Sequence, residues 1–243
     1  MTEELSAPLL ECALAIGVAV EDHRGRGYSG LRESQYHLDL VADEVARRVL
    51  GGAGFRVVSE ESGVSGTGDW TVVVDPIDGS TNCDRGIPFY ATSLAVLHHQ
   101  ELVAGLVVNH ATGTVFEAQK GAGAWRDGRP IHAGGQVSLA QAVVSFSGLP
   151  AHNLGWAQCR SLGAASLEIC LVADGSLDAF AVAGHSTLAP WDYLAGLLIA
   201  REAGAAYGDR RREELETSAM VSRRPVVAGS HELLALLLST GDS

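Results

Sequence analysis

The feature that most constrains this 243-residue chain is the string Asp-Pro-Ile-Asp-Gly-Ser-Thr-Asn at positions 75–82. It follows directly on residues 70–74, whose β-branched and aromatic side chains predict a strand. Pro76 and Gly79 are expected to end that strand, which places the carboxylates of Asp75 and Asp78 close together at its end. Two neighbouring carboxylates repel each other unless a cation lies between them, so the string predicts a metal site.

The donor atoms in this string indicate which metal and which ligand would bind. Hard carboxylate oxygens suit Mg²⁺, which keeps some water and takes a phosphate oxygen as a further ligand. Gly79 permits close backbone approach, Ser80 and Thr81 offer hydroxyls, and a helix starting here would present free N–H groups to a phosphate. The alternative is that Asp-Pro and Asp-Gly are only turn residues, but the whole string at a strand end favours the metal site.

Two further acidic positions are candidates for the same site. Glu60 follows a predicted strand at residues 55–59 that can lie beside residues 70–74, although a Glu-Glu pair is also typical of an exposed turn. Asp192 opens a predicted helix at residues 191–203, where capping of the helix and interaction with its dipole are the alternative explanation.

Composition limits the classes of partner. The net charge is −12, and the basic cluster at residues 210–212 is followed at once by acidic residues, so nucleic-acid binding is not expected. No apolar run reaches the ~18–20 residues of a membrane span, and no signal-peptide pattern is evident. The four cysteines form no CxxC pair, which argues against a zinc site or disulfides and favours a reducing cytoplasm.

Hydrophobic periodicity predicts a mixed α/β chain. Strands at residues 91–98, 102–109 and 114–119 are expected to form an antiparallel meander. Turn residues at 121–135 mark a soft boundary between an α+β unit, residues 1–135, and an α/β unit, residues 136–243. The other predicted helices span residues 5–20, 38–50, 163–172 and 231–238, and the other predicted strands span residues 142–147, 177–182 and 225–228.

Taken together, these segments resemble the inositol monophosphatase family of Mg²⁺-dependent, lithium-sensitive phosphatases. The matching stretches are Ser-Glu-Glu-Ser-Gly at 59–63, the string at 75–82 and Pro-Trp-Asp-Tyr-Leu-Ala-Gly at 190–196, with Leu-Gly-Ala-Ala-Ser-Leu at 162–167 in addition. The resemblance implies a layered αβαβα sandwich of the inositol monophosphatase and fructose-1,6-bisphosphatase type. It also implies a homodimer and inhibition by Li⁺.

The resemblance assigns roles to individual residues. It implies two or three Mg²⁺ ions, held by Glu60, Asp75, the carbonyl of Ile77, Asp78 and Asp192. Catalysis would rest on Glu60 and on Asp39 with Ser80, which would orient the attacking water; Ser80 stands where the family usually has threonine. The residues expected to contact substrate are Gly79, Ser80, Thr81, Gly163, Ala164, Ala165, His185 and Asp192.

The expected reaction is hydrolysis of a small polyol or sugar phosphate, such as inositol monophosphate, by metal-activated water. Two departures from the family leave the preference for inositol open. Residues 28–35 contain only Arg32 as a basic residue, where the family often has a lysine, and the loop at 184–190 lacks the acidic residue that family members often have before Asp192 and contains His185, which can face the substrate. Alternative substrates are histidinol phosphate, fructose 1,6-bisphosphate and a 3′-phosphoadenosine nucleotide. A non-catalytic, metabolite-binding relative is the alternative of a different class.

Overall fold

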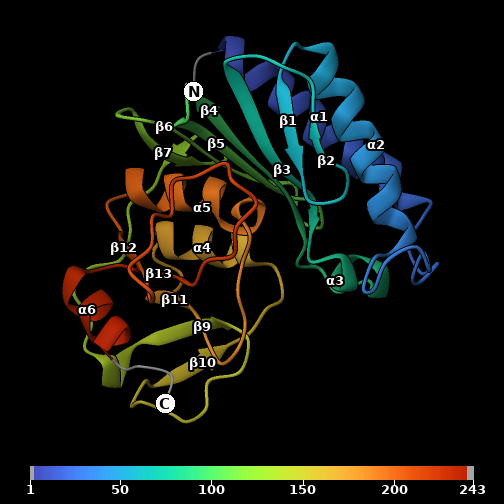
Figure 1. Cartoon of the computed structure of the whole chain (residues 1–243). Helices are drawn as coiled ribbons and strands as arrows, with labels where there is room; N and C mark the ends of the chain where they lie inside the picture. Colours follow the sequence, from blue (N-terminus) through green and yellow to red (C-terminus); the bar gives the residue numbers. More distant parts are fainter. Residues whose placement is uncertain (1–2, 240–243) are drawn as a thin grey trace.

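In the computed structural model, which describes residues 3–239, two β-sheets alternate with three layers of helices (Figure 1). Helices α1 (Glu3–Glu21) and α2 (His37–Gly52) cover the outer face of an eight-stranded sheet. Helices α4 (Ala165–Ala173) and α5 (Pro190–Glu202) lie between the two sheets, and α6 (His231–Ser239) packs on the second. The predicted αβαβα class is confirmed.

The first sheet brings two predicted ligands together through its one parallel pair. Strands β1 and β3 run parallel with Ser59 opposite Val74, so the next residues, Glu60 directly after β1 and Asp75 within β3, lie side by side. The remaining neighbours are antiparallel, in the order β2-β1-β3-β4-β5-β6-β7-β8. The strands are β1 (Arg56–Ser59), β2 (Gly63–Ser65), β3 (Trp70–Asp78), β4 (Ala91–His98), β5 (Glu101–Asn109), β6 (Thr114–Gln119), β7 (Gly123–Arg126) and β8 (Arg129–Pro130).

The second sheet is formed by the C-terminal half of the chain. Its five strands lie in the order β10-β9-β11-β13-β12. They are β9 (Val143–Ser147), preceded by the 3₁₀ turn η1 (Leu139–Gln141), β10 (Gln158–Arg160), β11 (Ala179–Val182), β12 (Ala206–Asp209) and β13 (Pro225–Ala228). The predicted boundary at residue 135 falls between the two sheets. The division into units stays a prediction, because α4 and α5 belong to one core shared by both sheets.

The two central helices are apolar on all sides because each is covered by a sheet on both faces. In α5, Leu194, Leu197, Leu198 and Ile199 are fully buried. Gly196 lets α5 approach α4 closely: a Cβ there would lie 2.9 Å from the carbonyl of Ser166. None of the helices within residues 3–239 combines the length and the apolar character that crossing a membrane requires.

The prediction that Pro76 and Gly79 end the strand was wrong for Pro76. Strand β3 continues to Asp78, which still pairs with Ala91 of β4, and the register shifts between Asp75 and Asp78. Proline is tolerated at such an irregularity because its missing N–H is not required by the ladder there. Gly79 ends the strand at φ +89°, and the short helix α3 (Ser80–Arg85) starts directly after it.

Candidate metal centre

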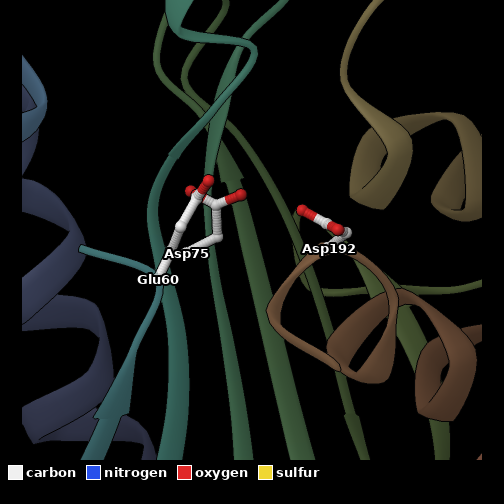
Figure 2. A group of neighbouring side chains, drawn as sticks. All are labelled: Glu60, Asp75 and Asp192. Carbon is white, nitrogen blue, oxygen red and sulfur yellow. The ribbon is translucent and has the colours of Figure 1, made fainter. Parts of the chain in front are cut away.

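Three carboxylates meet at the edge of the first sheet. Glu60, Asp75 and Asp192 each offer an oxygen, and these oxygens all lie within 4.8 Å of one another. Figure 2 shows Glu60, which follows β1, and Asp75, which belongs to β3, side by side, with Asp192 facing them from the start of α5. The structure thus brings together three of the predicted metal ligands, of which Asp192 lies more than a hundred residues after the other two in the sequence; their role as ligands stays a prediction.

Asp192 caps its helix, as the alternative explanation expected, and its carboxylate also lies beside those of Glu60 and Asp75. Its Oδ2 accepts a hydrogen bond of 2.7 Å from the N–H of Ala189, which caps the first turn of α5. Pro190 occupies the first turn of the helix, where its missing N–H has no helical partner to lose. Capping fixes the direction of the Asp192 side chain, so it supports the position of this carboxylate in the group.

Asp78 lies beside this group, and its carboxylate is bound by the start of α4. Oδ1 accepts from the N–H of Ala165 at 3.2 Å, and Oδ2 accepts from the N–H of Ser166 at 2.7 Å and from the Ser166 hydroxyl at 2.5 Å. Asp78 and Asp192 line one cleft. Asp78 thus adjoins the ligand group while being held by the second half of the chain.

Burial and mutual repulsion keep protons on these acids. Loss of solvent, with repulsion from Asp192 and Glu61, raises the pKa of Glu60 to about 8. Burial raises the pKa of Asp78 and of Asp192 to about 7 each. Burial and then repulsion from Glu60 and Asp78 raise the pKa of Asp75 well above its ordinary value.

This donor set fits a divalent cation. The Oδ1 atom of Asp75 is buried and has no hydrogen-bond partner among the described residues, which is costly for a carboxylate oxygen unless it is offset by a cation. All three groups offer hard oxygen atoms, which Mg²⁺ prefers over the softer ligands of zinc or copper sites.

Asp39 and Ser80, the residues predicted to activate water, lie close together, and their catalytic role stays a prediction. Burial raises the pKa of Asp39 to about 6. Hydrogen bonds from Ser80 and from the N–H of Tyr36 act in the opposite direction, and the bond from Tyr36 is 2.8 Å long. The Ser80 hydroxyl also lies 2.8 Å from the carbonyl of Ile77, to which it can donate. Asp39, Ser80 and Glu60 line one cleft of about 150 Å³.

The predicted phosphate contacts lie on and before α3. A Cβ at Gly79 would lie 2.9 Å from the carbonyl of Gly163, so only glycine allows these two loops to approach. Thr81 is exposed, and its hydroxyl lies 3.0 Å from the phenol oxygen of Tyr36. The contacts of Gly79, Ser80 and Thr81 with phosphate stay predictions.

A second cleft, of about 200 Å³, adjoins the metal group on the side of α4. Asp78 and Asp192 form one wall, and Gly163, Ala164 and Ala165, the predicted substrate-side residues, form another. His185 is exposed and is not among the residues that line this cleft, so its predicted contact with substrate is without support from the geometry.

Three residues near the site were missed by the sequence reasoning. Ser166 donates a hydrogen bond to Asp78. Glu168 is buried and accepts hydrogen bonds from the N–H of Leu162 and the hydroxyl of Ser145. Asp43 is buried one turn after Asp39. The acids had a visible signal, because an acidic residue within an apolar helix face needs a partner. Ser166 had none.

Comparison with known proteins agrees with this geometry. The model of the inositol monophosphatase family matches residues 39–241. The chain belongs to the inositol monophosphatase family. It is therefore a phosphoric monoester hydrolase, and the string at 75–82 and the acidic residues Glu60 and Asp192 all lie within the matched region.

Individual family members cover most of the chain. The fructose-1,6-bisphosphatase/inositol-1-monophosphatase of Methanocaldococcus jannaschii is 34% identical over 210 residues, 82% of each chain. The fructose-1,6-bisphosphatase of Pyrococcus furiosus is 33% identical over 207 residues, 83% of this chain and 81% of its own length. The solved structure of an inositol monophosphatase–fructose 1,6-bisphosphatase has a TM-score of 0.86 at 30% identity and covers 98% of this chain and 99% of its own.

Proposed function

We propose that this member of the family is an Mg²⁺-dependent phosphomonoesterase acting on a small monophosphorylated polyol or sugar. The observation that carries the proposal is the group of Glu60, Asp75 and Asp192, with an unpartnered buried oxygen on Asp75. Two or three Mg²⁺ ions would be held by these residues, by the carbonyl of Ile77 and by Asp78. When bound, Mg²⁺ supplies the positive charge that makes water acidic near neutral pH and neutralises phosphate oxygens.

The residues of the chain itself provide the proton path. Ser80 can accept a hydrogen bond from the attacking water, because a hydroxyl is both donor and acceptor. As the proton of the water moves to the Ser80 oxygen, the hydroxyl proton of Ser80 passes to Asp39, which is mostly ionised at pH 7 since its pKa lies at about 6. The water oxygen bonds to phosphorus while the bond from phosphorus to the alcohol oxygen breaks, and that oxygen takes up a proton from solvent. Asp39 thus serves as the final proton acceptor, and no covalent phosphoenzyme is required.

The second cleft favours an uncharged alcohol. Serine hydroxyls and apolar side chains line it beside Asp78, Glu168 and Asp192, and no lysine, arginine or histidine is among its lining residues in the described part of the chain. A second phosphate, as in fructose 1,6-bisphosphate or a 3′-phosphoadenosine nucleotide, would find no opposite charge there. We therefore place inositol monophosphate first, and fructose 1,6-bisphosphate second because relatives carry that name.

A substrate panel tests this proposal. Phosphate release is measured with Mg²⁺ on inositol 1-phosphate, fructose 1,6-bisphosphate, histidinol phosphate and a 3′-phosphoadenosine nucleotide, with Asp78→Asn as the control. We expect fastest release from inositol 1-phosphate and loss of release in the variant. No release from any of the four compounds would refute the proposal and favour a non-catalytic, metabolite-binding role.

Two properties implied by family membership are also proposed. The protein is expected to act in the cytoplasm as a homodimer, and Li⁺ is expected to inhibit it. Sedimentation equilibrium decides the oligomeric state, and a Li⁺ titration of the phosphate release decides the inhibition.

A further inference from the structure

Asp43 is a buried acid to which the proposed reaction assigns no role. It lies in α2 one turn after Asp39, and side chains four residues apart share one face of a helix. Only 7% of its surface is exposed. Its Oδ1 accepts hydrogen bonds from two hydroxyls, of Ser59 at 2.6 Å and of Ser62 at 2.9 Å. The two hydrogen bonds satisfy an acceptor atom that is buried away from water.

The two serines enclose the turn that carries Glu60. Ser59 is the last residue of β1, and Ser62 stands directly before β2. The Ser59 oxygen, while donating to Asp43, also accepts a hydrogen bond of 3.3 Å from the N–H of Glu61. Both ends of the turn are therefore bound to one oxygen atom of α2.

Glu60 depends on this turn for its direction. Within residues 3–239 no group donates a hydrogen bond to its carboxylate. Its backbone N–H is bound to the carbonyl of Val74 by a long hydrogen bond of 3.3 Å. The position of the Glu60 carboxylate beside Asp75 and Asp192 thus follows from how residues 59–62 are held.

We propose that Asp43 is a positioning residue for the metal centre: through Ser59 and Ser62 it holds the turn that aims Glu60 at Asp75 and Asp192. One helix then aligns two parts of the site, because α2 presents Asp39 to Ser80 and Asp43 to the turn of Glu60. The inference rests on the proposed function, since it concerns Mg²⁺ binding by this group.

Paired substitutions separate positioning from the charge of Asp43. Asp43→Ala removes the acceptor, whereas Asp43→Asn keeps an oxygen that can accept from both serines. Mg²⁺ binding to the metal-free protein is measured by isothermal titration calorimetry. We expect Asp43→Ala to weaken it about 10- to 100-fold, as is usual when a group that orients a metal ligand is lost, and Asp43→Asn to stay close to the parent protein. With saturating Mg²⁺, KM for the phosphate ester is expected to be unchanged.

A matched control separates positioning from general stability. Asp174 follows the last residue of α4, at the end away from Asp78; only 5% of its side chain is exposed, and it accepts a hydrogen bond of 2.6 Å from Arg126. Asp174→Ala is expected to lower the melting temperature without changing Mg²⁺ affinity. If Asp43→Ala does not fold, Ser62→Ala, an exposed position, removes one of the two bonds and is expected to weaken Mg²⁺ binding in the same direction.

The outcomes are distinct. If the parent protein binds Mg²⁺ and releases phosphate, and Asp43→Ala binds Mg²⁺ with unchanged affinity, the positioning role is overturned. The same result in Ser62→Ala overturns it where Asp43→Ala does not fold. An equal loss of affinity in Asp174→Ala overturns it as well, because the effect would then be one of stability. Failure of the parent protein to bind Mg²⁺ refutes the proposed function, and the positioning role with it.

Discussion

The carboxylate of Asp78 accepts a hydrogen bond of 2.5 Å from the hydroxyl of Ser166, across 88 residues of sequence. This bond joins the end of β3 in the first sheet to the first turn of α4, which lies between the sheets. Ser166 is fully buried, and its hydroxyl and N–H both favour the ionised form of Asp78, against the effect of burial. The second half of the chain thus fixes a carboxylate that the first half supplies.

Ser166→Ala removes one of three donors from Asp78 and is expected to raise the pKa of that carboxyl further above about 7. A hydrogen bond to a charged group contributes about 1.5–3 kcal/mol, so fewer molecules have Asp78 ionised at neutral pH. The Mg²⁺ concentration for half-maximal phosphate release should rise at pH 7 and return toward the parent value at pH 8.5. The same concentration in variant and parent at both pH values would contradict this account.

Stability of the metal-free protein is expected to fall as pH rises from about 4 to about 8. The pKa values of Asp39, Asp78, Asp192 and Glu60 are raised to about 6, 7, 7 and 8, so the folded chain binds more protons than the unfolded chain, whose acids titrate near 4. Stability therefore falls with pH in this window. Mg²⁺ needs the ionised carboxylates, so its stabilising effect should grow over the same window. Melting temperatures measured in EDTA and in Mg²⁺ between pH 5 and 8.5 test both the loss of stability without metal and the growing effect of Mg²⁺. A metal-free protein whose melting temperature rises with pH would contradict the prediction.

Asp75→Asn is expected to separate stability from function. Asp75 is buried, its Oδ1 has no partner among the described residues, and neighbouring carboxylates repel it. Removing this charge should raise the melting temperature of the metal-free protein at pH 8 while it abolishes the Mg²⁺-induced shift. Thermal unfolding of both proteins, with and without Mg²⁺, tests this. A variant that Mg²⁺ still stabilises as much as the parent would remove Asp75 from the ligand set.

Much of the fold followed from local patterns, and what was missed depends on tertiary contacts. Strands β4, β6 and β13 have the predicted bounds, because their β-branched and apolar runs are bounded by clear turns. The short strands β2, β10 and β12, and the β7–β8 hairpin, were not predicted. Each of these strands has three or four residues, except β8, which has two. Strands this short form because they pair with neighbouring strands, which a local pattern does not reveal.

The candidate site likewise combines residues that local patterns indicate with residues that only tertiary contacts reveal. Glu60, Asp75 and Asp192 were candidates from their positions at strand and helix ends, and each had an ordinary explanation as a turn or cap residue. The parallel register of β1 and β3 brings two of them together, and that register is not visible in either segment alone. Ser166 could not be predicted, because nothing local distinguishes a serine that binds Asp78 from one that faces solvent.

Ser80→Ala is expected to lower kcat about 10²- to 10⁴-fold, the usual contribution of a positioned proton-transfer group. Mg²⁺ affinity should change much less than kcat, because Ser80 is not one of the residues proposed to hold the ion and its hydroxyl only lies beside the carbonyl of Ile77, 2.8 Å away. Ser80→Thr keeps the hydroxyl and should retain most activity. Kinetics of both variants with a calorimetric Mg²⁺ titration test this, and a normal kcat in Ser80→Ala would assign proton transfer elsewhere.

The central claim is that Glu60, Asp75 and Asp192 bind Mg²⁺ for hydrolysis of a phosphate monoester. The most direct test measures phosphate release from inositol 1-phosphate by the purified protein, first in EDTA and then after addition of Mg²⁺. The account predicts no release in EDTA and restoration of release by Mg²⁺. Release that continues unchanged in EDTA would contradict it.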